Sequence, residues 1–211
     1  MMLQRVIFWI KKLRHVNILK SLYYSYKFKG KIICGNCRMH IHGGGRICLT
    51  NNATLYIGVD YSYPVPAVLD LHQGVLSIKG NVSINRGCKV VIGKNATLEI
   101  GNGSFINEGS KIYCNKSIKV GEKCAIGFDV KLLDTDIHKI FDKNEQINNN
   151  KDIFIGNKVW IGANSLVLKG SIIDDNTIIG ANSIVKCKCN GNHIYAGNPL
   201  KELSEFDQWK L

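Results

Sequence analysis

The chain has 211 residues, which suits one domain with a small appendage, and 45% of them are hydrophobic, which excludes global disorder. Its 28 lysines and arginines outnumber its 16 acidic residues, so the formal net charge is +12. The eight cysteines lack the spacing of a disulfide framework, which argues against a small secreted scaffold.

Residues 1–30 are predicted to form a basic amphipathic helical segment. Apolar residues recur at helical spacing, and most basic residues lie on the other side: Leu3, Val6, Ile7, Ile10 and Leu13 against Arg5, Lys11, Lys12 and Arg14. Residues 1–59 contain ten basic residues and no acidic one, so the positive charge belongs to this end. The apolar run VIFWI is far shorter than the ~20 residues that span a bilayer. It is also too short for the core of a signal peptide.

Two interpretations of this segment remain open. Either residues 1–29 lie on an anionic membrane surface, or the helix caps the following domain and its charges are solvated. A nucleic-acid partner is not expected, because no recognised binding motif accompanies the basic residues.

The cysteines are expected to be reduced and mostly buried. Cys34 and Cys37 form a C-x-x-C motif, but no second pair lies at the distance of a zinc ribbon. Cys187 and Cys189 are too closely spaced for a usual zinc pair. Buried thiols serve as small hydrophobic side chains. We therefore expect no metal ion, and a cytoplasmic protein.

Residues 31–77 are expected to form early, irregular coils of the fold that follows. They contain a GGG turn and the short motif LYIG. The stretch DYSYPVPAVLDLHQG, residues 60–74, interrupts the pattern and is predicted to be a protruding loop.

The C-terminal half repeats every six residues. Aliphatic residues occupy one position of the repeat: Ile155, Ile161, Val167, Ile173, Ile179 and Val185. Small or β-branched residues follow four positions later: Val159, Ser165, Ser171, Thr177 and Ser183. Earlier frames run through Ile78 to Val90 and Ile100 to Ile118. A fixed short period over about a hundred residues indicates an all-β solenoid, in which three hexapeptides close one triangular coil.

One frame of the repeat reaches a histidine. Val120, Ile126 and Leu132 are six residues apart, and the same step then predicts that His138 occupies a position in the ladder. An irregular polar stretch, residues 139–152, follows at once and is predicted to be a loop that walls the site. The alternative is an ordinary surface histidine at a corner.

The repeat domain is predicted to extend over residues 31–203. The segment NPLKELSEFDQW then covers the last coil or runs along one face, and residues 204–211 form a C-terminal tail.

The motifs VWIGA, IGANSIV and AGNPLK occur in order, and with the repeat over residues 75–203 they resemble the hexapeptide-repeat acyltransferases. This resemblance implies a left-handed parallel β-helix, acetyl-CoA as co-substrate, and a homotrimer with active sites between subunits. The segment DTDIH, residues 134–138, is similar to the D-x-D-x-H segment of sugar O-acetyltransferases of the maltose and galactoside group. The similarity implies that His138 is the catalytic base. Asp136 and Asp134 are the local candidates to orient its ring, and a backbone carbonyl is the alternative.

The same resemblance assigns binding residues. Asn107 and Trp160 match positions at the acceptor and the donor–acceptor cleft, and Asp134 is a further substrate-binding candidate. The acid that the maltose and galactoside enzymes place a few residues after Asn107 is missing. Ala163 and Ala181 match positions along the pantetheine arm. Lys186 and Lys201 match positions near the phosphates of CoA.

The expected function is transfer of an acetyl group to a sugar hydroxyl, in the synthesis of capsule, lipopolysaccharide or another surface glycan. The alternatives are N-acyl transfer, a non-glycan acceptor such as serine or an antibiotic, and a scaffold without activity. A carbonic anhydrase is not expected, because the six histidines do not form the H-x4-H motif of that family.

Overall fold

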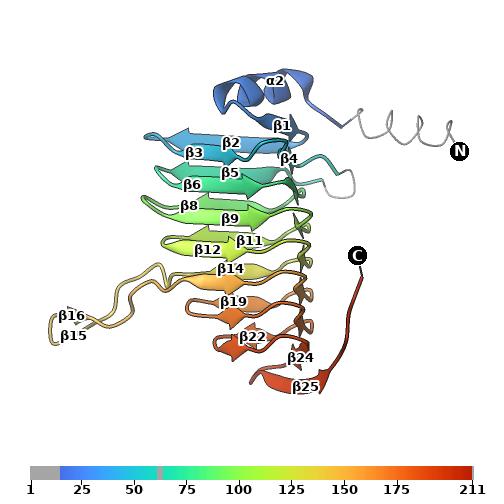
Figure 1. The fold of residues 1–211 in the computed structure, drawn as a ribbon. Coiled ribbons are helices and arrows are strands. Elements are labelled where there is room, and N and C mark those ends of the chain that lie inside the picture. The colour runs from blue at the N-terminus through green and yellow to red at the C-terminus, as the bar shows by residue number, and fades with distance from the viewer. Residues whose placement is uncertain (1–14, 61–63, 211) are drawn as a thin grey trace, which may run out of the picture.

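The computed structural model describes residues 15–60 and 64–210 and shows a stack of coils built from short strands (Figure 1). The coil strands lie in three sheets, and each full coil contributes one strand to each sheet. Neighbours within a sheet are therefore mostly three strands apart along the chain. This topology is the predicted solenoid, and it fits a parallel β-helix.

Sheet A contains, in spatial order, β1 (Lys31–Cys34), β4 (Thr54–Ile57), β7 (Asn81–Ile84), β10 (Phe105–Ile106), β13 (Ala125–Ile126), β18 (Trp160–Ile161), β21 (Ile178–Ile179), β24 (His193–Ala196) and β25 (Lys201–Glu205). Sheet B contains β2 (Cys37–His42), β5 (Ala67–His72), β8 (Lys89–Ile92), β11 (Lys111–Cys114), β14 (Lys131–Leu133), β19 (Leu166–Leu168) and β22 (Ile184–Val185). Sheet C contains β3 (Arg46–Leu49), β6 (Val75–Lys79), β9 (Thr97–Gly101), β12 (Ser117–Val120), β17 (Ile153–Ile155), β20 (Ile172–Ile173) and β23 (Lys188–Cys189).

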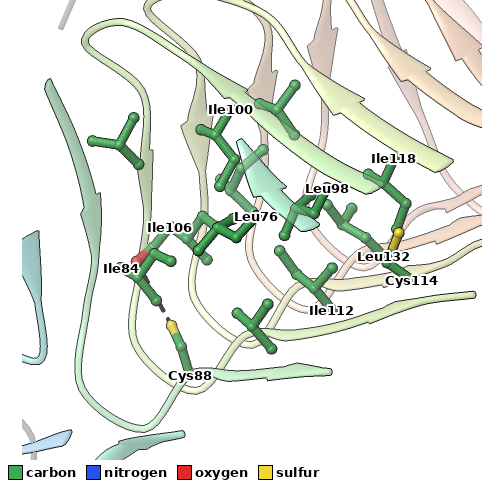
Figure 2. Close-up of a cluster of buried hydrophobic side chains, with 14 of the residues drawn as sticks. Leu76, Ile84, Cys88, Leu98, Ile100, Ile106, Ile112, Cys114, Ile118 and Leu132 are labelled. Atoms are coloured by element: carbon green, nitrogen blue, oxygen red, sulfur yellow. Dashed lines mark hydrogen bonds between the residues drawn. The ribbon is translucent and has the colours of Figure 1, made fainter. Parts of the chain in front are cut away.

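The aliphatic residues of the repeat form the core. Parallel pairing places Ile106 beside Ile126, Ile126 beside Ile161, and Ile161 beside Ile179. The ladder residues from Ile155 to Val185 are all fully buried. Figure 2 shows how such side chains from successive coils meet on the axis. The aliphatic residue that recurs every six positions is thus confirmed as the inward residue of each short strand.

The small residues of the repeat are buried at the corners and join one coil to the next. The hydroxyl of Ser165 donates to Gly180 O at 2.9 Å, and that of Ser171 donates to Val185 O at 3.0 Å. Thr177 donates in the same way to Asn190 O at 3.2 Å. A hydroxyl fits here because its partner is a carbonyl of the adjacent turn, which satisfies a buried polar group.

Helix α2 (Ile18–Lys27) closes the N-terminal end of the stack (Figure 1). Its N-cap is Asn17, whose side chain accepts a hydrogen bond from Lys20 N. The hydroxyls of Ser21 and Ser25 accept hydrogen bonds from Cys34 N and Ile32 N, two amides of β1 at the edge of sheet A. These residues of the segment therefore pack on the first coil. The predicted amphipathic stretch at positions 3–13 lies outside the described residues.

The other end is closed by β25, which pairs antiparallel with β24. The chain then turns back along the coils, and Trp209 Nε1 donates to Lys158 O at 2.7 Å. The predicted segment therefore both covers the last coil and runs along a face. The strand β25 extends to Glu205, two residues beyond the predicted end of the repeat domain.

Two sequence predictions need correction. Residues 60–74 do not form one loop, because Ala67, Leu69 and Leu71 point inward and build the strand β5. His138 does not occupy the ladder: the chain leaves the coil after Leu132 and Leu133, and His138 is exposed. The loop that was predicted for residues 139–152 therefore begins near residue 134. This excursion from the coil carries the antiparallel pair β15 (Phe141–Asp142) and β16 (Glu145–Gln146).

All eight cysteines lie within the described residues and are free thiols. Six are buried, whereas Cys48 and Cys187 are exposed. Burial raises the pKa of Cys88 to about 12 and that of Cys124 to about 11, so both thiols stay protonated at neutral pH. Among the described residues, no helix combines the length and the apolar character that a membrane crossing needs.

The stacked core predicts a large difference between inward and outward aliphatic residues. Leu98→Ala leaves a cavity among fully buried side chains, so it is expected to lower the free energy of unfolding by about 2–5 kcal/mol. Ile172→Ala serves as the control, because Ile172 is 42% exposed. Urea denaturation followed by circular dichroism measures both. Equal losses of stability in the two variants would contradict the inward assignment.

Candidate active site

A groove runs along the corner between sheets A and B. Its volume is about 410 Å³, and it is lined by Phe105, Asn107, Ala125, Gly127, Phe128, Trp160, Ala163, Trp209 and Lys210. Three of the predicted binding residues, Asn107, Trp160 and Ala163, thus meet on neighbouring coils. Larger polar hollows of about 570 and 530 Å³ lie near Asn192 and near Lys29, away from these residues.

Trp160 and the C-terminal tail form one wall of this groove. Trp160 is 45% exposed, and its ring lies 6.1 Å from the ring of Trp209. The hydrogen bond from Trp209 to Lys158 O fixes the tail there. Trp209 was not predicted, because nothing in the repeat indicates where the tail returns.

The floor of the groove consists of closely stacked backbone turns. Gly127 N donates to Ile161 O at 2.8 Å, and Gly162 N donates to Ile179 O at 2.7 Å. A Cβ atom on Gly127 would lie 2.6 Å from Ile161 O, so only glycine fits. Ala163 follows on this corner, and Ala181 occupies the equivalent exposed position one coil further. The glycines and alanines thus place only small residues at this corner, beside the exposed rings of Phe128 and Trp160.

Asn107 is held by its surroundings. Its Oδ1 accepts a hydrogen bond from Asn85 Nδ2 at 3.2 Å, and its backbone carbonyl accepts one from the thiol of Cys88 at 3.0 Å. Within the described residues its Nδ2 group has no partner. The amide therefore has a fixed orientation and keeps a donor for a ligand.

His138 lies at a different corner, in the excursion between sheets B and C. Its backbone N–H donates to Asp136 O at 2.7 Å, and its carbonyl accepts from Asn148 Nδ2 at 2.7 Å. In the described parts of the chain its imidazole has no hydrogen-bond or ion-pair partner. The preceding Ile137 has φ +68°, a conformation that costs a β-branched residue about 1–3 kcal/mol. The loop thus holds an exposed imidazole on a strained backbone.

The carboxylate of Asp136 orders this loop. It accepts from Lys169 Nζ at 2.6 Å and from Asn148 Nδ2 at 3.0 Å. The same lysine also donates to Asn148 O at 3.0 Å. Lys169 and then Asn148 lower the pKa of Asp136, so the carboxylate is charged at neutral pH. Asp136 is therefore bound to Lys169 and Asn148, and not to the ring of His138. Sequence reasoning missed Lys169, which lies 33 residues away.

Asp134 anchors the root of the loop. It is fully buried, and its two carboxylate oxygens accept hydrogen bonds from Asn115 N at 2.7 Å and Lys116 N at 2.8 Å. Burial raises the pKa of this carboxyl group, and the two backbone amides partly offset that effect. Both oxygens serve the turn of the preceding coil, so their geometry is that of a structural group.

The remaining candidates are dispersed over the surface. Lys186 is exposed at the corner between sheets B and C, which is also the corner of the His138 loop. Lys201 is exposed on β25. Within one chain, the structure does not join His138 or either lysine to the groove that contains Trp160.

Comparisons with known proteins agree with this architecture. The family described as "Bacterial transferase hexapeptide (six repeats)" matches residues 152–187. A polysialic acid O-acetyltransferase of Escherichia coli O1:K1 / APEC is 34% identical over 63% of this chain and 41% of its own length. The galactoside O-acetyltransferase of Escherichia coli K12 is 29% identical over 64% of this chain and 73% of its own length.

The fold of the chain is also similar to that of a protein with a known crystal structure. The polySia-specific acetyltransferase NeuO has a TM-score of 0.57 and 26% identity, over 85% of this chain and 84% of that chain. The matched region spans less than half the length of the polysialic acid O-acetyltransferase sequence above. Residues 152–187 thus match the hexapeptide transferase family, and the proteins similar to this chain include polysialic acid and galactoside O-acetyltransferases.

Proposed function

We propose that this protein transfers an acetyl group from acetyl-CoA to a hydroxyl of a sugar, in the synthesis of capsule, lipopolysaccharide or another surface glycan. The observation that carries the proposal is the groove in which Asn107, Trp160 and Ala163 meet. The names of the relatives, which act on polysialic acid and galactosides, support a glycan acceptor.

In the proposed reaction His138 is the general base. Its imidazole takes the proton of the sugar hydroxyl while the oxygen attacks the thioester carbonyl of acetyl-CoA. The new C–O bond forms, the C–S bond breaks, and the CoA sulfur receives the proton from the imidazolium. Histidine suits this role because an imidazole exchanges protons near neutral pH. The exposed position of His138 on a strained backbone supports the assignment.

The distance between His138 and the groove favours an active site between subunits. His138 lies at the corner between sheets B and C, whereas Asn107 and Trp160 line the corner between sheets A and B. We infer a homotrimer in which His138 of one chain faces the groove of its neighbour. Lys186 and Lys201 are the proposed contacts of the CoA phosphates. We also infer that the β-helix is left-handed, as the resemblance to hexapeptide-repeat acyltransferases implies.

The thiols and the N-terminal helix support a proposal for the cellular location. Eight free cysteines favour a reducing compartment, and we place the protein in the cytoplasm. An outer face of α2 consists of exposed apolar side chains, namely Ile18, Leu19, Leu22, Tyr23 and Tyr26. Because Lys27 Nζ lies 5.7 Å from the centroid of the Tyr23 ring and residues 1–59 contain no acid, we propose contact with an anionic membrane.

His138→Ala is expected to reduce acetyl transfer by about 10²–10⁴-fold and to leave binding of acetyl-CoA unchanged, because only the base is removed. Transfer is measured as CoA thiol released with sialic acid oligomers or galactosides as acceptors, and donor binding is measured by calorimetric titration. His193→Ala, a histidine on β24, is the control.

Near-normal turnover of His138→Ala would overturn the catalytic assignment. Failure of the folded wild-type chain to bind acetyl-CoA would favour a scaffold or another donor. Transfer only to amines or antibiotics would select one of the alternative acceptors.

Lys169→Met is expected to lower kcat by up to about 10²-fold, since misplacement of a reacting group by ~1 Å has effects of that size. Donor binding should persist, and Lys169→Arg should restore part of the activity because it keeps a cation beside Asp136. Cleavage in residues 134–152 by thermolysin should also become faster. Lys119→Met, which removes an exposed ion pair with Glu99 at 3.7 Å, is the matched control. Unchanged kcat in Lys169→Met would contradict the positioning role.

The double substitution Leu19→Gln and Leu22→Gln is expected to weaken sedimentation with phosphatidylglycerol vesicles by about tenfold or more, because each buried leucine contributes about 1.5–3 kcal/mol. Both side chains are exposed, so the helix keeps its contacts with β1. Leu203→Gln, at the opposite end of the stack, is the control. Equal binding of all three proteins would remove the membrane proposal.

A further inference from the structure

Two neighbouring strands near the N-terminal end of the stack present histidines on the outer face of sheet B. The register of β2 and β5 pairs His42 with His72 and His40 with Asp70. Positions two residues apart on a strand share one face, so all four side chains emerge on the same side. The strands lie close to the coil that α2 covers (Figure 1).

Three of these side chains converge. His72 Nε2 lies 3.0 Å from Asp70 Oδ1, and His42 Nε2 lies 3.5 Å from the same oxygen. The ligand atoms of the three residues all lie within 4.8 Å of one another. The rings of His42 and His72 are stacked, with centroids 5.0 Å apart and planes inclined by 14°.

We propose that His42, Asp70 and His72 form a surface binding site for a divalent transition-metal ion of the Zn²⁺ class. Zinc bonds of about 2.0–2.1 Å to nitrogen and oxygen in a tetrahedron place neighbouring ligand atoms roughly 3.3 Å apart. The distances of 3.0 and 3.5 Å from the two imidazoles to Asp70 Oδ1 lie on either side of that value. Two imidazoles and one carboxylate are also ligands that zinc accepts, with the remaining position open to water.

The geometry around Asp70 favours a metal over an ion pair alone. Asp70 Oδ1 is buried, and in the described residues it has no hydrogen bond with acceptable direction, although His72 Nε2 is only 3.0 Å away. The nitrogen is therefore near the oxygen without pointing at it. A metal between the three groups requires each lone pair to point at the ion and not at a neighbouring ligand.

The backbone beneath the cluster is well fixed. His42 O accepts hydrogen bonds from Gly45 N at 3.0 Å and from Gln73 N at 3.3 Å, which joins the turns that follow the two histidines. Gly43 has φ +55°, and a Cβ atom there would lie 2.6 Å from the side-chain nitrogen of Gln73. The turns are thus packed together, and the ligands need little rearrangement to bind an ion.

This site is separate from the proposed acetyl-transfer chemistry. The cluster lies on β2 and β5, whereas the groove lies on the coils of β10, β13 and β18. A bound ion would connect two adjacent coils through side chains, in addition to their backbone pairing. Because it would bind the folded chain and not the unfolded one, it should stabilise this end of the stack.

The test is calorimetric titration of the full chain with ZnCl2, after dialysis against a chelator and with a phosphine reductant. The wild type is expected to bind one Zn²⁺ per chain at this site. His42→Gln, His72→Gln and Asp70→Asn should each weaken binding by more than ~10-fold, since loss of even an outer-shell group costs about 10–100-fold. Zn²⁺ should also raise the unfolding temperature of the wild type but not of these variants.

Two controls separate this cluster from other ligands. His193→Gln removes a histidine that lies 3.6 Å from Glu202 and Glu205, and it should bind Zn²⁺ as the wild type does. The measurements use a background in which the exposed Cys48 and Cys187 are replaced by serine. Absence of Zn²⁺ binding by the folded protein would overturn the proposal. Zn²⁺ affinity of His42→Gln and His72→Gln equal to that of the wild type would also overturn it, and the cluster would then be an ion pair alone.

Discussion

The structure depends on the stacking of each coil on the next through parallel backbone pairing and an inward column of aliphatic side chains. Ile106, Ile126, Ile161 and Ile179 form one such column, and each is fully buried. A coil contacts mainly its two neighbours, so the two ends of the stack remain unpaired unless another element covers them. The helix α2 and the antiparallel strand β25 meet this requirement.

The same stacking converts distance along the chain into position on a surface. Residues about twenty to thirty-six positions apart meet at one corner, which is how Asn107, Gly127 and Ala163 come to line one groove. The corner that carries His138 is interrupted by the excursion after Leu133. The buried carboxylate of Asp134 ties its root to the preceding turn.

The outer faces of the sheets follow a second rule, because alternate residues of each strand point away from the core. On sheet B this brings Asp70 and His72 beside His40 and His42. The arrangement is rigid because the six paired positions from Cys37 to His42 fix the register. The ligands of a metal site in such a fold therefore need not lie close together in the sequence. A search for local sequence motifs alone overlooks a site of this kind.

The sequence by itself determined the solenoid, its inward ladder and the small residues of its corners, because each of these repeats within six residues and depends on local geometry. It did not determine that β5 continues the coil, although Ala67, Leu69 and Leu71 alternate as a strand does. It also placed His138 in the ladder, since a fixed step cannot reveal where the chain leaves the coil. The ion pair of Asp136 with Lys169, the return of Trp209 to Trp160 and the meeting of His42 with His72 were decided by tertiary structure alone. Each joins residues from different coils, so the stacking register brings them together and no local pattern records it.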